Sequence, residues 1–306
     1  MSEAFGDRLI GRVRALGHPL CVGLDPHLAK FPPLFRQGAM APGAPETAEA
    51  VVSFCLAVLD RVAGRVAAVK PQSAFFEQLG PAGVAALGRV IAEARRRDLL
   101  VILDAKRGDI ASTAEGYAAA YLAKDAPLRA DALTVNPYLG LDTLEPFAAA
   151  AQESGAGLFV LVKTSNPGSA DLQDLPAPDR PLYEHLAESL APLSDRLTGG
   201  DTGWSSLGVV VGAPWPEPSQ RIRQLLPRTP FLVPGYGAQG GGLTEAFAGF
   251  VPGPNNTREG GLINSSRAIL FPAAANVSDT TTWERAIDTA LTTTISKFKR
   301  AASEST

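Results

Sequence analysis

One stretch of the sequence decides the fold class: Leu100-Val101-Ile102-Leu103-Asp104-Ala105-Lys106-Arg107-Gly108-Asp109. It begins with a continuous apolar run, which is typical of a parallel strand that is covered on both faces. Residues two apart on a strand project to the same side, so Asp104 and Lys106 can point together into a site at the end of this strand. Asp109 comes after Gly108, where the chain can turn sharply, and its carboxylate can therefore face elsewhere.

The same kind of apolar run recurs along the chain, and it predicts eight strands. The strands are expected at Leu20–Leu24, Val66–Val69, Leu99–Leu103, Ala132–Val135, Gly157–Val162, Leu207–Val211, Phe231–Val233 and Gly261–Ile263. Amphipathic helical patterns lie between most of them, for example Thr47–Val62 and Gly83–Arg97, and Phe5–Leu16 predicts a helix before the first strand. This alternation indicates an α/β protein, either a closed (β/α)8 TIM barrel or a doubly wound sheet.

The position of the chemically informative residues favours the barrel, because one of them lies just after each predicted strand. These residues are Asp25, Lys70, Asp104, Asn136, Lys163, Gly212, Pro234 and Ser265. A barrel brings all eight carboxyl ends around one mouth, whereas an open sheet brings together only a few of them. We therefore predict a single TIM-barrel domain over residues 1–306, with a helix within Leu182–Leu193. The tail Lys297–Thr306 is short, polar and terminal, so we expect it to be frayed.

Composition excludes several classes of protein. Of the 306 residues, 45% are hydrophobic and 19% charged, which suffices for a core without disulfides or structural metals. The net charge of −3 argues against a nucleic-acid partner, which would need a basic surface. Two cysteines, Cys21 and Cys55, form no disulfide framework. The charged segment Met1–Leu20 does not resemble a targeting signal, and no apolar run is long enough for a membrane helix. We expect a cytoplasmic protein.

Each group of candidate residues also has a purely structural interpretation. Asp104 and Lys106 could form only an ion pair that closes the barrel. Lys70 ends an apolar run, where a lysine is placed to line a cavity, but its head could also simply reach water. The scattered histidines have no metal-ligand spacing and predict no metal site; they are His18, His27 and His185.

The segment Leu103–Ile110 resembles the Asp-x-Lys-x-x-Asp signature of the orotidine 5′-monophosphate decarboxylase family, in its longer bacterial form (type 2). Further segments resemble motifs of the same family in the same order: Cys21–Pro26, Val69–Glu77, Lys163–Ser169, Pro234–Gly241 and Asn264–Arg267. One departure is visible, because many relatives carry Gly immediately before the phosphate-binding arginine and this chain has Ser266.

The resemblance implies a carboxy-lyase that decarboxylates orotidine 5′-monophosphate to UMP in de novo pyrimidine synthesis, without a metal or an organic cofactor. It also implies a homodimer with shared active sites. The implied catalytic residues are Lys70, Asp104, Lys106 and Asp109, with Lys106 protonating C6 and Asp109 supplied by the other subunit. The implied substrate-binding residues are Asp25 and Thr113 for the ribose, Ile110 at the interface, Ser165 for the pyrimidine, and Gly237, Gln239 and Arg267 for the phosphate.

Three rival functions remain open from the sequence. A related barrel could decarboxylate a sugar phosphate such as keto-gulonate phosphate with Mg²⁺, which would need a further acidic ligand near the second strand. A Schiff-base aldolase also uses lysines at strand ends. A nucleotide-binding barrel without catalysis is the third, and the intact charged residues argue against it.

Overall fold

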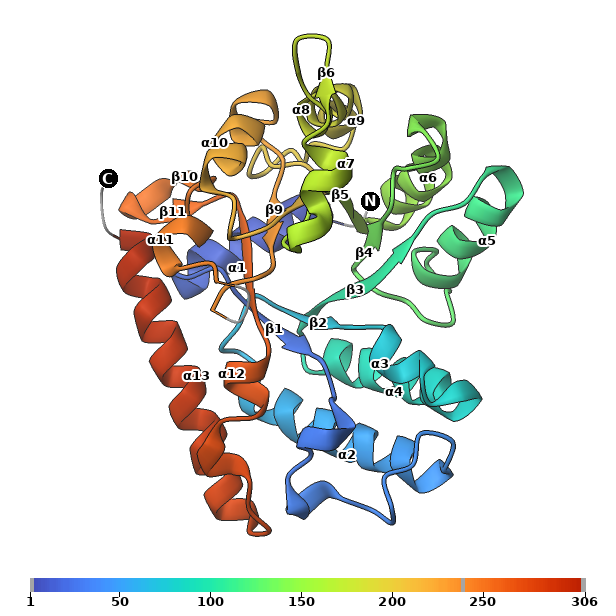
Figure 1. Cartoon of the computed structure of the whole chain (residues 1–306), viewed down its shortest axis with the longest axis vertical. Helices are drawn as coiled ribbons and strands as arrows, with labels where there is room; N and C mark the ends of the chain where they lie inside the picture. Colours follow the sequence, from blue (N-terminus) through green and yellow to red (C-terminus); the bar gives the residue numbers. More distant parts are fainter. Residues whose placement is uncertain (1–2, 238–239, 304–306) are drawn as a thin grey trace.

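The computed structural model describes residues 3–237 and 240–303, apart from the side chain of Asn255. Its central sheet is a closed barrel of parallel strands in the order β1-β12-β9-β8-β5-β4-β3-β2 (Figure 1). These are β1 Leu20–Leu24, β2 Ala68–Pro71, β3 Leu100–Arg107, β4 Ala132–Val135, β5 Gly157–Lys163, β8 Leu207–Val211, β9 Phe231–Val233 and β12 Gly261–Ser265. The predicted TIM barrel is confirmed, and the predicted bounds of β1, β4, β8 and β9 agree to the residue.

Helices surround the barrel between successive strands (Figure 1). They are α1 Phe5–Leu16, α2 Pro45–Val62, α3 Ala74–Glu77, α4 Gly80–Arg96, α5 Ala111–Tyr121, α6 Glu145–Ser154, α7 Ala170–Gln173, α8 Leu182–Ser189, α9 Ala191–Arg196, α10 Pro216–Leu225, α11 Leu243–Ala246, α12 Arg267–Leu270 and α13 Thr280–Ser303. The helix predicted within Leu182–Leu193 is divided into α8 and α9, because Pro192 begins a new helical turn after Leu190. None of the helices in the described ranges is long and apolar enough to cross a membrane.

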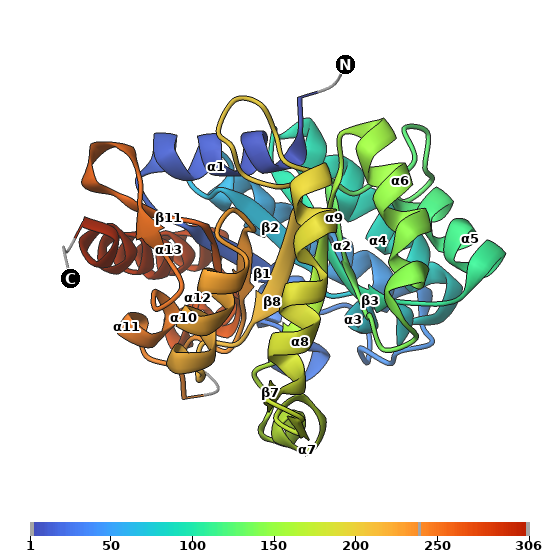
Figure 2. The ribbon, with the colours of Figure 1, turned by 90° about the horizontal axis from the view of Figure 1, so that it is seen from above.

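Shorter elements occupy the long connections. Two antiparallel hairpins are formed by β6 Pro176–Ala177 with β7 Arg180–Pro181 and by β10 Val251–Pro252 with β11 Arg258–Glu259. The 3-10 helices are η1 Leu28–Lys30, η2 Pro33–Phe35, η3 Leu141–Leu144, η4 Pro167–Ser169, η5 Pro254–Asn256 and η6 Ala273–Ala275. Figure 2 shows α7 and β7 projecting from the barrel at the far end of α8.

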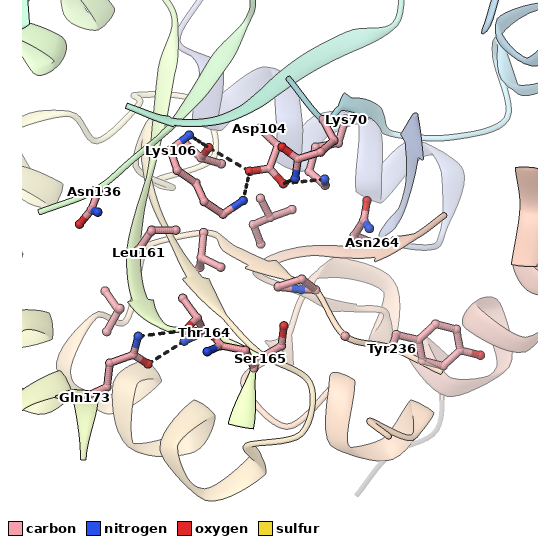
Figure 3. A pocket seen from close by; sticks show the side chains of 18 of the residues that line it. Lys70, Asp104, Lys106, Asn136, Leu161, Thr164, Ser165, Gln173, Tyr236 and Asn264 are labelled. Atoms are coloured by element: carbon pink, nitrogen blue, oxygen red, sulfur yellow. Dashed lines mark hydrogen bonds and ion pairs between the residues drawn. The ribbon is translucent and has the colours of Figure 1, made fainter. Parts of the chain in front are cut away.

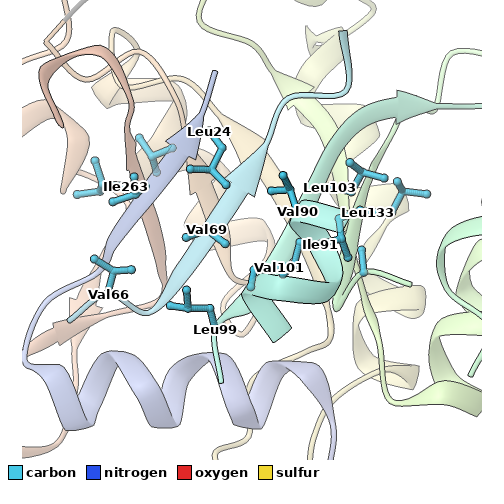
Figure 4. Packing of buried hydrophobic residues seen from close by; sticks show 14 of the residues in the cluster. Leu24, Val66, Val69, Val90, Ile91, Leu99, Val101, Leu103, Leu133 and Ile263 are labelled. Atoms are coloured by element: carbon cyan, nitrogen blue, oxygen red, sulfur yellow. The ribbon is translucent and has the colours of Figure 1, made fainter. Parts of the chain in front are cut away.

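Strand side chains alternate between two cores. Val69, Val101 and Leu103 face outward and pack with Val90 and Ile91 of α4, as Figure 4 shows. The inward-facing set fills the barrel and forms a separate cluster, which includes Cys21, Leu100, Ile102, Phe159, Val210 and Leu232. The alternation of strand side chains explains why continuous apolar runs are needed here.

Helix α1 covers the amino-terminal end of the barrel (Figure 2). Phe5 is fully buried and meets the ring of Phe159 edge-on, with the centroids 6.0 Å apart. Gly208 leaves room for that ring, because an added Cβ would lie 2.4 Å from Phe159. Arg8 donates to Asp131 at 2.8 Å, directly before β4. The first helix is therefore part of the barrel core.

The expectation of a frayed tail was wrong for residues 297–303. Helix α13 continues to Ser303, and Phe298 and Ala302 are fully buried. The ring of Phe298 packs against Tyr236, with centroids 5.2 Å apart, and against Phe247 at 6.2 Å. Two buried apolar residues four positions apart on a helix outweigh the polar composition of this segment. Residues 304–306 lie outside the described part of the chain.

His18 is a buried imidazole in the turn between α1 and β1. Its Nδ1 accepts the backbone N–H of Leu20 at 3.3 Å. Burial, reinforced by the positive charge of Lys299, lowers the pKa of His18 from 6.5 to about 4. The folded chain therefore keeps His18 neutral at pH values where the unfolded chain protonates it.

We predict that this histidine makes the protein less stable as the pH falls from 6.5 to 4, because only the unfolded chain takes up the proton. A shift of this size corresponds to a loss of about 3 kcal/mol in the free energy of unfolding. Asn can accept the same hydrogen bond without titrating, so His18→Asn should remove this part of the pH dependence. Chemical denaturation of both proteins across this range measures the effect. Parallel pH profiles would contradict the assignment.

Candidate active site

The carboxyl ends of the barrel strands surround a cavity of about 1200 Å³. Many of the predicted site residues line it: Asp25, Lys70, Asp104, Lys106, Ser165, Gly237 and Arg267. They follow different strands, and the closed barrel brings them to one mouth. The bottom of the cavity is apolar, since Val210 and Leu232 belong both to its lining and to the cluster inside the barrel, and Leu161 lines the cavity and packs against that cluster.

Three of the other predicted residues, Asp109, Ile110 and Thr113, do not line this cavity. Asp109 follows β3, and its Oδ1 accepts the N–H of Ile110 at 2.9 Å. Ile110 and Thr113 are exposed at the start of α5. Gln239 lies outside the described residues. Within one chain, the structure therefore separates the predicted site into a cavity group and an exposed group.

A network of charges and hydrogen bonds centres on the Asp104 carboxylate (Figure 3). Lys70 Nζ lies 2.7 Å from Asp104 Oδ2, and Lys106 Nζ lies 2.5 Å from Oδ1. The Gln72 amide donates to Oδ2 at 3.1 Å, and the Thr134 hydroxyl donates to Oδ1 at 3.1 Å. One carboxylate is thus held by two ammonium groups and two neutral donors.

Burial and charge compete at this network, and charge prevails. Burial alone would lower the pKa of Lys70, but the carboxylates of Asp104 and Asp25 raise it above its ordinary value. Burial alone would raise the pKa of Asp104, but the ammonium groups of Lys70 and Lys106 hold it well below its ordinary value. Lys70 and Asp104 are therefore both charged at neutral pH.

The end of β3 is irregular, and this irregularity places Lys106. The pairing of β3 with β4 changes register between Leu103 and Arg107. Lys106 has a φ of 48°, a left-handed conformation that is rare for residues other than glycine. The Thr134 Oγ1 accepts the N–H groups of Ala105 at 3.0 Å and Lys106 at 2.8 Å, which stabilises the unusual backbone. The Lys106 side chain remains 45% exposed and reaches into the cavity.

Sequence reasoning missed Gln72 and Thr134. Each is a polar residue at the carboxyl end of a strand, and this position was the available signal. Gln72 follows Lys70 by two residues, and Thr134 interrupts the apolar run of β4. Both line the cavity and bond to the same carboxylate.

Two buried acceptors at the cavity have no hydrogen-bond partner among the described residues. They are the Oδ1 atoms of Asp25 and Asn264. The Asn264 amide donates to the Ser266 hydroxyl at 3.1 Å, and Ser266 in turn lies over Gly23. An added Cβ on Gly23 would lie 2.0 Å from Ser266 Oγ, so the absence of a side chain there makes room for Ser266. The free acceptors suit the hydroxyl donors of a ligand.

The comparisons with known proteins agree with one another. Residues 18–276 match the model of the family described as "Orotidine 5'-phosphate decarboxylase / HUMPS family". The chain is 42% identical over 291 residues to an orotidine 5′-phosphate decarboxylase of Rhodopirellula baltica, covering 92% of this chain and 95% of that protein. It is 42% identical over 273 residues to that of Cellvibrio japonicus, covering 88% and 89%. The structure of Leishmania donovani OMP decarboxylase is similar with a TM-score of 0.76 and 34% identity, covering 99% of this chain and 100% of that one.

We predict that Thr134→Val destabilises the protein, because the backbone N–H of Lys106 loses its acceptor. Leaving such a group unsatisfied costs about 1–3 kcal/mol in the free energy of unfolding. Thr134→Ser keeps the hydroxyl and should retain most of the stability, so it is the matched control. Chemical denaturation of the three proteins makes the comparison. Equal stability of the Val and Ser variants would show that the hydroxyl does not hold the end of β3.

Proposed function

The chain belongs to the orotidine 5′-phosphate decarboxylase / HUMPS family, and we propose that within it the protein is an orotidine 5′-monophosphate decarboxylase, a carboxy-lyase that forms UMP in pyrimidine biosynthesis. The observation that carries the proposal is the Lys70–Asp104–Lys106 network at the cavity. It supplies a cation beside an apolar floor, at a place where a small anionic substrate can enter.

The proposed reaction breaks the bond between C6 and the carboxylate of the substrate. CO₂ leaves, and the electron pair stays on C6. Lys106 Nζ then gives its proton to C6, and the neutral amine regains a proton from solvent. An ammonium that attracts the developing negative charge more strongly than it attracts the bound substrate lowers the barrier. No metal or organic cofactor takes part in this proposal.

Asp104 holds the reacting ammonium in place. Its carboxylate bonds Lys106 on one oxygen and Lys70 on the other, so contacts within the protein orient both ammonium groups. Catalysis by charge that is already oriented does not require the site to reorganise during the reaction. The carboxylate of Asp104 would also lie near that of the substrate, where their repulsion would disfavour the bound ground state.

Groups distant from C6 are proposed to bind the rest of the nucleotide. Arg267 presents a planar fork of donors that suits phosphate oxygens. Gly235 and Gly237 have φ values of 91° and 72°, so their loop can turn its backbone toward a phosphate without side chains in the way. The unpartnered Oδ1 of Asp25 would accept a ribose hydroxyl. Ser165 would bond the pyrimidine ring.

We also propose a homodimer in which Asp109, Ile110 and Thr113 reach the partner's cavity. They lie outside the cavity of their own chain, and Ile110, directly before α5, is one of four exposed large apolar residues in this region. The others are Tyr138, Leu139 and Leu141, just before or at the start of η3, which packs against α5; the four are 59%, 74%, 52% and 43% exposed. Large apolar side chains grouped at a surface are typical of an interface between proteins. Asp109 would then complete the row of alternating charges from across the interface.

We predict that Lys106→Ala abolishes decarboxylation of orotidine 5′-monophosphate, because no other group is proposed to protonate C6. The variant should still fold and bind UMP, since the phosphate contacts are intact. Turnover is followed by the pyrimidine absorbance, binding by calorimetry, and Lys124→Ala serves as an exposed lysine control.

Two treatments of the wild-type protein separate the rival chemistries. Turnover should survive EDTA, and borohydride with substrate should not inactivate the enzyme. Loss of turnover in EDTA would favour a metal-dependent reaction, and borohydride trapping would favour a Schiff base.

Retained activity in the Lys106→Ala variant would refute the assignment of Lys106 as the proton donor.

The shared site predicts complementation between two inactive variants. Lys106→Ala and Asp109→Asn should each be inactive alone. After the two are unfolded and refolded together, a mixed dimer contains one site with Lys106 from one chain and Asp109 from the other, so activity should return. A mixture that stays inactive while forming mixed dimers would place Asp109 outside the partner's site, and a fully active monomer would remove the dimer proposal.

A further inference from the structure

A second buried lysine lies at the carboxyl end of β5, outside the network of Asp104. The pairing of β5 with β8 changes register between Leu161 and Lys163, and Leu161 lines the cavity whereas Lys163 does not. Only 1% of the Lys163 side chain is exposed. Burying an ammonium group is costly unless it is paired and hydrogen-bonded, so its partners indicate its role.

The ammonium of Lys163 has an unusually complete set of partners. Its Nζ lies 2.6 Å from Asp174 Oδ1 and donates to the Ser169 hydroxyl at 3.3 Å. It also lies 4.7 Å from the centroid of the Trp215 ring and 5.8 Å from that of Tyr183. Cations are attracted to the faces of aromatic rings at such distances. The lysine thus joins β5, the end of α7, the start of α8 and the connection after β8.

The ion pair closes a loop at its base. We call Thr164–Gln173 the Ser165 loop; it runs from directly after Lys163 to directly before Asp174. Its two ends are also joined by the Gln173 side chain, which accepts the Thr164 N–H and donates to the Thr164 hydroxyl, both at 2.9 Å (Figure 3). Trp215 Nε1 donates to the Thr164 carbonyl at 2.8 Å. The base of the loop is fixed although the segment beyond it projects from the barrel.

Ser165 lies directly beyond this fixed base. Its backbone packs on Gly212, where an added Cβ would lie 2.6 Å from Ser165 Cα. The Gly212 N–H donates to the Lys163 carbonyl at 2.7 Å. The backbone of the same lysine therefore fixes where the loop begins relative to the end of β8. Ser165 lines the cavity together with Thr164 and Gln173. A shift at the base would therefore move Ser165 relative to Lys106.

We propose that Lys163 and Asp174 are positioning residues for the decarboxylation, and that their ion pair fixes Ser165 against the substrate. The proposal rests on the proposed function, because it takes Ser165 as the residue that meets the pyrimidine. Neither Lys163 nor Asp174 touches the reacting atoms; both act through the Ser165 loop. A rigid support of this kind matters because small displacements of a contact residue cost a large part of its effect.

The kinetic test is a double-mutant cycle between Asp174 and Ser165. Asp174→Asn removes the charge but keeps the size of the side chain and an oxygen that can accept from Lys163. Because it leaves the buried Lys163 without its counterion, a variant that lacks both charges is measured beside it. If the pair acts through Ser165, Asp174→Asn and Ser165→Ala each lower kcat/KM by about tenfold or more, and the double variant is no worse than Ser165→Ala alone. Asp174→Glu should recover part of the loss. Losses that multiply in the double variant would overturn the proposal.

Two further proteins make the outcome decisive. Arg180→Met is the matched control, because Arg180 pairs with Glu188 in the same projecting segment but forms no hydrogen bond or ion pair with residues 164–173. Its kcat/KM should stay unchanged. Lys163→Met/Asp174→Leu removes both charges, so no buried ion is left unpaired, and it should show the same loss as Asp174→Asn. An equal loss in Arg180→Met would assign the effect to the segment as a whole and refute the proposal.

Hydrogen exchange separates failure of this inference from failure of the proposed function. Backbone amides of residues 164–173 should exchange faster in Asp174→Asn than in the wild type, and Arg180→Met should leave them unchanged. A wild-type protein without turnover on orotidine 5′-monophosphate would refute the function, yet the exchange experiment would still show whether the pair holds the loop. Unchanged exchange in Asp174→Asn would refute the positioning role whatever the activity.

Discussion

The site depends on one carboxylate, that of Asp104, which lies between the ammonium groups of Lys70 and Lys106. Each ammonium offsets part of the cost of burying the carboxylate, and the carboxylate does the same for the buried Lys70. Gln72 and Thr134 satisfy the oxygens further, so removing any member leaves a charge or a donor unpaired. The barrel makes this arrangement possible because it brings the ends of β2, β3 and β4 together.

Irregular strand ends convert the regular barrel into a site. Pairing changes register at the end of β3 and again at the end of β5, and in each case a lysine lies at the change. At β3 the left-handed Lys106 enters the cavity, whereas at β5 Lys163 turns away from it and holds a loop. Regular alternation builds the core, and its interruption decides which charged groups can reach a ligand.

The sequence predicted the strands well because continuous apolar runs identify a buried parallel sheet, and it placed Lys70, Asp104 and Lys106 at one mouth. It did not predict the roles of Thr134 or Lys163, since a single polar residue at a strand end does not reveal its direction when the register changes. The buried end of α13 was missed because Phe298 and Ala302 stand among polar residues. The roles predicted for Asp109, Ile110 and Thr113 depend on the proposed second chain, and the structure describes a single chain.

The helix that precedes the barrel has a bearing on the electrostatics of the far end. Phe5 and Leu9 belong to the same apolar column as Val210 and Leu232, and the upper surface of that column is the floor of the cavity. The column keeps the medium beneath the charged network poorly polarisable, and interactions between charges are stronger in such a medium. Shortening the amino terminus would admit water from below, so residues remote from the mouth help to set the local dielectric constant at Lys70 and Asp104.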